Sequence, residues 1–392
     1  MDFATRSRGR FLVLLSAVAV AALGFVAGFL WRGQAPSRYS LLDEAYTLLT
    51  EHYLDALPGS TELQRSMIRG MLQEVGDPFT VYVEPAAHEL ESDNLAGEYG
   101  GIGALLSLDA EGRVHLIPSA GGPAERAGVR EGDVLSAIDG RRLEPGTGLE
   151  EVSAALRGPA GTEVTLTLVS AETDEAPRDV TMVRETIPLP SVTGYLLPDD
   201  RTIGVLAVTS FSERTPDELA GAYADLLARG ASKIILDLRG NSGGLLDSGL
   251  AVSRYFLESG VVLMERGRGG SDEVYRAERA GEAADVPLAV LVDATSASAA
   301  EIVAAALQAN GRAPLIGTVT YGKGSVQLIF ELSDGSSLHV TTARWLTPSG
   351  EQIDGAGLTP DIPLDTAAAP GGSDPFLQAA AAWLNGSGSS GP

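Results

Sequence analysis

The spacing of apolar and polar positions changes along the chain, and each spacing predicts a different kind of structure. Residues 11–31 form an uncharged apolar run. Over residues 39–74 apolar side chains recur at helical spacing, and Pro58-Gly59-Ser60 divides this stretch into two predicted helices. Short strand-like runs occupy residues 100–185, and from Thr202 onward strand-like and helix-like runs alternate. The pattern predicts a multidomain protein of the α/β (α+β) class.

The apolar run predicts a membrane helix. At roughly 1.5 Å per residue, the segment from Phe11 to Trp31 is long enough to cross a hydrocarbon core of about 30 Å. Arginines at positions 6, 8 and 10 precede it and are expected to stay in the cytoplasm. We therefore expect a single-pass anchor with an extracytoplasmic body, either periplasmic or extracellular. The alternative is a signal peptide cleaved near Gly33-Gln-Ala35, which would export the same body.

The strand-like runs of the middle region predict a small, partly open barrel. Two short helices interrupt them. Gly128 directly follows the first helix, and Gly158 follows the second after Arg157. The expected strands are Ile102–Leu108, Val114–Ile117, Val134–Ile138, Val164–Val169 and Val180–Arg184, and the expected helices are Pro123–Ala127 and Leu149–Leu156.

The last region predicts an α/β core in which helices cover at least one face of the sheet. The expected strands are Ile203–Val208, Lys233–Leu238 and Leu288–Val292, and the expected helices are Pro216–Ala228, Leu245–Leu257 and Ser298–Gln308. The chain ends in a Gly/Ser-rich stretch, residues 386–392, whose composition predicts a disordered tail.

Composition narrows the chemistry. The formal net charge is −24, which argues against binding nucleic acid by neutralising phosphates. The chain has no cysteine, so disulfides, thiolate metal sites and thiol catalysis are excluded. No metal or other cofactor is expected.

A serine and a lysine in two separate segments are the candidate catalytic pair. Ser298 lies where a predicted strand turns into a predicted helix, and free N–H groups at that helix end favour a developing oxyanion. Lys323 follows 25 residues later between two glycines. Burial would lower its pKa, so that it could accept the serine proton. Gln327 would share a strand face with Lys323 and hold its amine. Each segment also fits a simple helix cap or hairpin.

Two glycine-rich segments are candidate binding loops. Gly243 and Gly244 follow a buried strand and can present backbone N–H groups; without a following Gly-Lys-Ser/Thr, a phosphate loop is disfavoured. The loop at residues 100–106 can bind the carboxylate of a peptide that extends the sheet. The predicted carboxylate and side-chain contacts of this second site are Gly101, Ile102, Gly103, Ala104, Val152 and Leu156.

Together these segments resemble the carboxy-terminal processing proteases, also called tail-specific proteases. Three core motifs carry the resemblance: Ser-Ala-Ser-Ala-Ala-Glu at 296–301, Gly-Lys-Gly-Ser-Val-Gln at 322–327, and Asp-Leu-Arg-Gly-Asn-Ser-Gly-Gly at 237–244. Flanking motifs at 76–80, 346–350 and 357–361 also match, and residues 100–185 resemble the PDZ domain of that family. The resemblance covers residues 40–365. The chain departs from the family pattern at Ala300, often serine, and at Ser242, often proline.

The resemblance implies a serine endopeptidase whose core is similar to the ClpP/crotonase-like fold, and the apolar run at 11–31 would anchor it to the membrane. It implies Ser298 as nucleophile, Lys323 as general base and Gln327 as its partner. The N–H groups of Ala299 and of Gly243 or Gly244 would form the oxyanion hole. The PDZ domain would bind substrate C-termini and gate the site, with Arg130 a candidate for that gating.

The implied domains are an N-terminal tip, anchor and linker (1–38), a helical region (39–96), the PDZ domain (97–186), the peptidase core (187–368), and a C-terminal helix with the tail (369–392). The expected partners are proteins or peptides with apolar C-termini, the membrane through residues 11–31, and a second copy or an adaptor.

Two alternatives differ in class. A PDZ adaptor with a silent peptidase core would keep the fold without the activity. A penicillin-recognising enzyme would need Ser-x-x-Lys within one helical turn, and Glu301 stands where that lysine should be.

Overall fold

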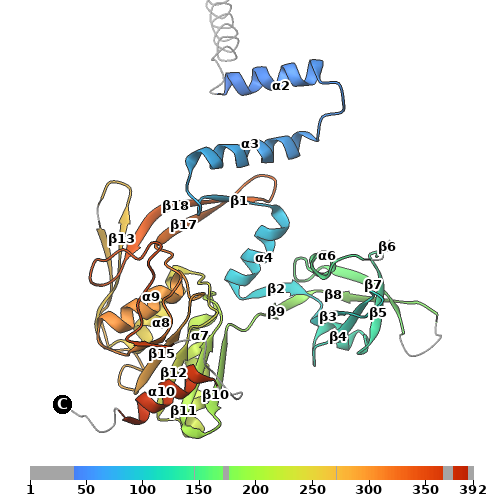
Figure 1. The fold of residues 1–392 in the computed structure, drawn as a ribbon. Helices are drawn as coiled ribbons and strands as arrows, with labels where there is room; N and C mark the ends of the chain where they lie inside the picture. The colour runs from blue at the N-terminus through green and yellow to red at the C-terminus, as the bar shows by residue number, and fades with distance from the viewer. Residues whose placement is uncertain (1–38, 145, 171–175, 271, 365–373, 387–392) are drawn as a thin grey trace, which may run out of the picture. The chain divides into compact units, whose positions relative to one another are not determined.

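The computed structural model describes residues 39–144, 146–170, 176–270, 272–364 and 374–386 (Figure 1). The chain divides into two compact units, residues 1–70 and 71–392. The two predicted N-terminal helices are confirmed as α2 (Ser40–His52) and α3 (Ser60–Val75). None of their side chains is buried.

The prediction of a membrane anchor needs correction. Across the described ranges, no helix combines the length and the apolar character needed to cross a membrane. The predicted span itself, residues 11–31, lies outside those ranges. The fold class is therefore corrected to a mixed α/β protein, with the expected PDZ domain and peptidase core but without the predicted transmembrane helix in the described ranges, and the predicted single-pass localisation is not supported.

The peptidase core is built on a six-stranded sheet in the order β10-β11-β12-β15-β16-β19. β10 runs antiparallel to β11, and the remaining neighbours are parallel. The strand bounds are β10 Val192–Leu197, β11 Asp200–Val208, β12 Lys233–Asp237, β15 Leu288–Val292, β16 Leu315–Gly317 and β19 Ile362–Pro363.

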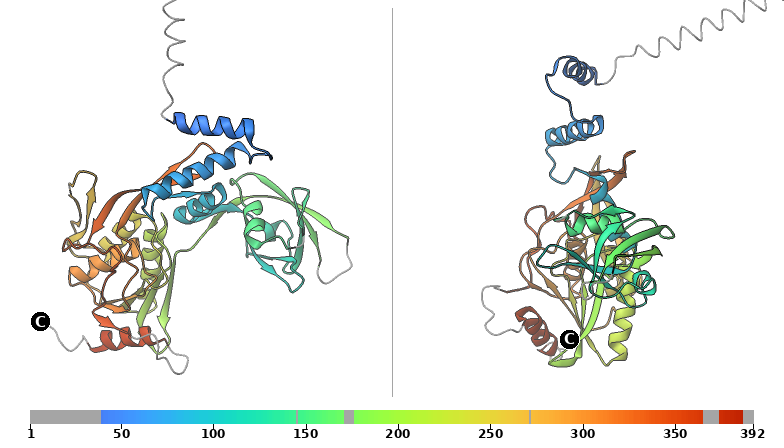
Figure 2. Two further views of the ribbon diagram at one scale, coloured as in Figure 1. Left: turned by 45° about the horizontal axis from the view of Figure 1, so that its top comes forward. Right: turned by 90° about the vertical axis from the view of Figure 1, so that its right-hand side faces the viewer.

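Helices cover both faces of this sheet. Alternate side chains of β15 enter two cores: Leu288, Val290 and Val292 face the cluster that includes α7, α8 and α9, while Ala289 and Leu291 face α10. All five residues are buried, as expected for a parallel strand covered on both sides (Figure 2). The helices are α7 Thr215–Ala228, α8 Leu246–Phe256, α9 Ala299–Ala309 and α10 Pro375–Gly386.

A second sheet lies beside the first within the core. Its order is β1-β18-β13-β14, and β17 pairs with β18 on a separate edge. The predicted strand after Lys323 is confirmed as β17, and the sequence pattern did not indicate the others. The bounds are β1 Val81–Val83, β13 Gly260–Gly267, β14 Asp272–Ala277, β17 Ser325–Glu331 and β18 Ser337–Leu346.

The middle region forms the predicted small barrel, with strand order β3-β4-β5-β7-β8 and β6 paired with β5. All five predicted strands and both predicted helices are present. Their bounds are β3 Ala104–Leu108, β4 Val114–Pro118, α5 Pro123–Arg126, β5 Asp133–Ile138, β6 Arg141–Arg142, α6 Leu149–Leu156, β7 Glu163–Val169 and β8 Arg178–Val183.

One helix and a two-stranded ribbon connect this barrel to the core. Helix α4 (Pro85–Ala96) starts with a proline and ends at Gly97, whose φ of 75° suits the left-handed helix cap. β2 (Glu98–Gly101) then pairs with β9 (Glu185–Pro188), the strand by which the chain leaves the barrel. The N–H of Glu213 donates to the carbonyl of Leu95, which ties the end of α4 to the core.

Candidate active site

Three loops of the core meet at the carboxyl ends of neighbouring parallel strands. Residues 238–245 follow β12, residues 293–298 follow β15, and residues 318–324 follow β16. Ligands commonly bind at this edge of an open α/β sheet. The three core motifs predicted from the sequence are therefore brought together by the topology itself.

Ser298 is held in an unusual backbone conformation at the start of α9. Its φ is 53° and its ψ is −118°, a region that costs a non-glycine residue about 1–3 kcal/mol. The neighbouring backbone fixes it, since the N–H of Ala297 donates to the carbonyl of Asn241 at 2.9 Å. Ser298 is half-buried at the N-terminus of this helix, and backbone strain of this kind is typical of residues in active sites.

Glu301 links the serine segment to the lysine segment, and its role was not predicted from the sequence. Its side chain is fully buried, and its carboxylate accepts four hydrogen bonds. One oxygen accepts from the Thr320 hydroxyl (2.5 Å) and the Gly322 N–H (2.7 Å). The other accepts from the backbone N–H groups of Ser298 and Lys323, both at 2.9 Å. The Ser-x-x-Glu spacing of a capping box, from Ser298 to Glu301, is the sequence signal that could have indicated this role.

Lys323 is half-buried, and burial lowers the pKa of its amine while the Glu91 carboxylate raises it to a smaller extent. Its Nζ lies 5.6 Å from the ring centroid of Phe79. Within the described residues, no hydrogen bond joins this amine to Ser298 or to Gln327. The backbone is anchored by Glu301 and by Trp345, whose indole N–H donates to the Lys323 carbonyl at 2.9 Å.

Gln327 lines the same cavity as Lys323 but has a different hydrogen-bond partner from the one predicted. Its amide N–H donates to the carbonyl of Phe79, in the loop before β1. Phe79 therefore contacts both residues, through its ring and its carbonyl. The flanking motif at 76–80 contains Phe79, but nothing in the sequence indicated a role for it at the site, because it lies more than 240 residues away from Lys323 and Gln327 along the chain.

Of the two predicted oxyanion glycines, Gly243 lies directly against Ser298 and Gly244 against the backbone of Phe211. A Cβ added to Gly243 would be 2.7 Å from the Cβ of Ser298, and a Cβ on Gly244 would be 2.1 Å from the Phe211 carbonyl oxygen. The N–H of Gly243 already donates to the Asn241 side chain at 2.8 Å. Hence the N–H groups of Gly244 and Ala299 are the better placed of the predicted donors, since the first helical N–H groups lack intrahelical acceptors.

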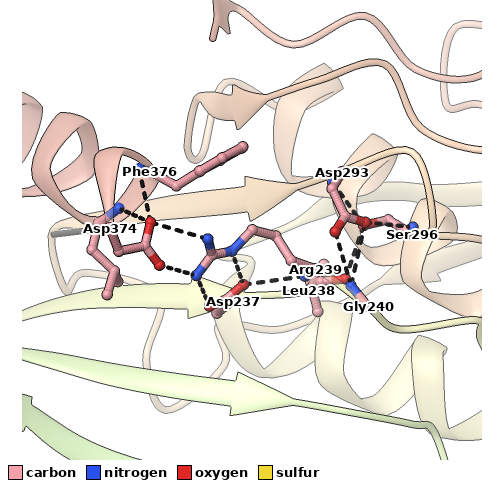
Figure 3. Close-up of polar contacts among 9 residues, drawn as sticks. Asp237, Leu238, Arg239, Gly240, Asp293, Ser296, Asp374 and Phe376 are labelled. Carbon is pink, nitrogen blue, oxygen red and sulfur yellow. Dashed lines mark hydrogen bonds and ion pairs between the residues drawn. The ribbon is translucent and has the colours of Figure 1, made fainter. Parts of the chain in front are cut away.

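An ionic cluster involves Arg239 and Gly240, at the start of the loop that carries the oxyanion glycines (Figure 3). Arg239 pairs with Asp237 at 2.6 Å and with Asp374 at 2.9 Å, and its guanidinium lies 4.9 Å from the ring centroid of Phe376. Asp293 accepts from the N–H of Gly240. Through Asp374, which also caps α10, the C-terminal helix is connected to the loop that carries the oxyanion glycines.

The candidate catalytic and oxyanion residues line one cavity of about 710 Å³: Ser298, Ala299, Gly243, Gly244, Lys323 and Gln327. Glu91, Asn94 and Leu95 of α4 form part of its wall, as does His339 of β18. Among the residues with described positions, no three His, Asp or Glu side chains are grouped to hold a metal ion.

The predicted peptide-binding residues of the barrel are only partly exposed to a groove. A narrow groove of about 40 Å³ is lined by Gly101, Ile102, Ala104 and Leu156. Gly103 is outside this groove, and Val152 is fully buried in the barrel core. Gly101 ends β2, Ile102 lies between β2 and β3, and Ala104 begins β3, while Leu156 is the last residue of α6 on the opposite wall.

An arginine that the sequence analysis did not single out lies at this groove. Arg130 is exposed, and its backbone N–H donates to Asp133 at 2.8 Å. Arg157 lines the groove instead, 4.4 Å from the ring centroid of Tyr99 and paired with Asp93 of α4 at 2.7 Å. The Arg-Gly-Pro sequence after α6 had been interpreted only as a helix end.

Comparisons with known proteins agree with this architecture. Residues 202–364 match peptidase family S41, and residues 118–170 match the PDZ domain. Carboxy-terminal processing protease CtpA of Bacillus subtilis (strain 168) is 36% identical over 361 residues, covering 90% of this chain and 76% of the relative. The carboxyl-terminal-processing protease of Synechocystis sp. is 38% identical over 334 residues, covering 82% and 77%. The solved photosystem II D1 C-terminal processing protease is 30% identical, with a TM-score of 0.48, and covers 85% of this chain and 88% of its own.

An α/β peptidase core preceded by a PDZ domain defines a class of serine peptidases. The chain belongs to the carboxy-terminal processing protease family, within peptidase family S41, and is a serine-type peptidase. The resemblance predicted from the motifs is confirmed at this level.

Proposed function

We propose that the protein is an endopeptidase that binds the C-terminus of a protein substrate in its PDZ groove and cleaves the chain through an acyl-enzyme on Ser298. The observation that carries the proposal is Glu301, whose buried carboxylate holds the backbones of Ser298 and Lys323 in one cavity. A silent peptidase core has no need to keep this connection. The family relationship supports protein substrates.

The proposed chemistry uses Lys323 as the base. Neutral Nζ accepts the proton of the Ser298 hydroxyl as Oγ attacks the scissile carbonyl carbon. The N–H groups of Gly244 and Ala299 stabilise the oxyanion. When the C–N bond breaks, the ammonium returns the proton to the leaving amine. A water then releases the acyl group from Oγ, with Lys323 again taking and returning one proton.

Lys323 must change its side-chain rotamer for this step, because its amine lies beside Phe79 rather than hydrogen-bonded to Ser298. In the catalytically competent rotamer, the side-chain amide oxygen of Gln327 would accept a hydrogen bond from the Lys323 amine. Its N–H group would continue to donate to the carbonyl of Phe79. This keeps the predicted role of Gln327 and gives Phe79 the role of positioning it.

The test is cleavage of a peptide that ends in apolar residues by wild-type, Ser298→Ala and Lys323→Ala proteins. We expect both substitutions to reduce kcat by at least about 1,000-fold. The same peptide with an amidated C-terminus should show a raised KM, because the PDZ groove binds a free carboxylate. Turnover that survives in either variant contradicts the mechanism, and peptide binding without any turnover supports the adaptor alternative.

A further inference from the structure

Helix α4 places an acidic side chain inside the catalytic cavity. Glu91 lines this cavity together with Lys323, Gln327 and His339. Its carboxylate lies 3.1 Å from Nε2 of His339, whose side chain is 9% exposed, but the contact does not have hydrogen-bond geometry. A carboxylate in this position is unusual for a cavity in which a lysine must lose its proton, because a nearby negative charge favours the ammonium form.

The other charged groups around the lysine loop are already engaged. Glu301 is saturated by four hydrogen bonds. Asp354 accepts from the N–H of Gly324 at 3.0 Å and pairs with Arg344 of β18 at 3.0 Å. Asp77, in the loop that carries Phe79, accepts from the hydroxyl of Thr80 at 2.6 Å.

We propose that Glu91, on the wall of the catalytic cavity, is a positioning residue that favours the charged form of Lys323. This rests on the proposed role of Lys323 as the base. The opposing effects of burial and of Glu91 on the pKa of Lys323 agree with it. Because α4 leads through Gly97 into β2 and the barrel, any displacement of α4 removes this charge from the cavity and favours the neutral, reactive amine.

The sequence allows a direct measurement, because the chain contains two lysines, Lys233 and Lys323. Lys233 lies at the surface, where its amine donates a hydrogen bond to the side-chain oxygen of Asn385. It therefore serves as an internal reference. In full-length Ser298→Ala protein labelled with [13C]lysine, the side-chain signals of the two residues are titrated by NMR. Lys323 should titrate at a lower pH than Lys233, and Glu91→Gln should lower the titration midpoint of Lys323 by about 1 further pH unit.

A matched control separates local from overall charge. Glu89 lies on the same helix, is exposed and does not line the cavity, so Glu89→Gln removes the same charge and should leave the Lys323 midpoint unchanged. Equal Lys323 midpoints with and without Glu91 overturn the proposal.

Activity gives an independent reading. In otherwise wild-type protein, Glu91→Gln should move the acidic limb of the kcat/KM profile to lower pH and raise the rate on that limb about tenfold. Ser298-dependent turnover with an unmoved limb contradicts the role of Glu91 alone. A titration shift in a protein without turnover contradicts the proposed function alone.

Discussion

The fully buried Glu301 offers the sharpest prediction about how the site is assembled. Glu301→Gln keeps the shape of the side chain but replaces one carboxylate oxygen with an NH2 group. The remaining oxygen can still accept from Thr320 and Gly322, whereas the N–H groups of Ser298 and Lys323 would then face a second donor. The two segments that carry the proposed catalytic pair therefore lose the contact that joins them.

The magnitude follows from the two lost hydrogen bonds. A hydrogen bond to a charged group contributes about 1.5–3 kcal/mol, so the aligned arrangement should lose about 3–6 kcal/mol. At about 1.4 kcal/mol per factor of ten, kcat should fall by at least about 100-fold, with KM changed much less. The assay is steady-state peptide cleavage, with circular dichroism to confirm the fold. Glu258→Gln, at an exposed position, is the charge-matched control. A kcat for Glu301→Gln within threefold of wild type refutes the reasoning.

Three further predictions concern the loops around the site. Gly243→Ala places a Cβ against Ser298 at a φ of 107° and should abolish most activity in a cleavage assay, whereas Gly221→Ala, with nothing within 4 Å, should not. Asp374→Ala should remove both the cap of α10 and the pairing with Arg239, lowering the free energy of unfolding by about 1 kcal/mol in urea, and an unchanged midpoint would contradict this. Burial would raise the pKa of Asp293, but hydrogen bonds from Thr295, Gly240 and Ser296 outweigh it and lower the pKa. Its stabilising contribution is therefore present above about pH 4 and lost as the pH falls further, so the difference in Tm between wild type and Asp293→Asn should shrink on acidification and should not grow.

The local sequence pattern was sufficient to predict the buried parallel strands and the edge of the sheet at which their following loops meet. Leu288–Val292 was predicted as a buried strand because five apolar residues leave no solvent-facing side, and the structure covers it on both faces. Parallel strands then bring their following loops to one edge, so Ser298, Lys323 and the Gly243-Gly244 pair meet without further information.

Contacts between distant segments were beyond this reasoning. Phe79 and Glu91 reach the lysine from residues more than 230 positions earlier, and no periodicity connects them to Lys323. Helix α4 itself had readable signals in Pro85 and Gly97, although its apolar face is weak. The membrane helix was predicted from the length and hydropathy of residues 11–31 and from the arginines that precede them, and no described helix has that character.

The catalytic assignment rests on a covalent intermediate at Ser298, and trapping that intermediate tests it most directly. Wild-type protein, mixed with a substrate ester and quenched in acid, should gain the mass of one acyl group, and peptide mapping should place that group on Ser298. The Ser298→Ala protein should gain nothing. Turnover of the peptide with the acyl group on another residue, or with no acyl group in a rapid quench of the ester, would contradict the account.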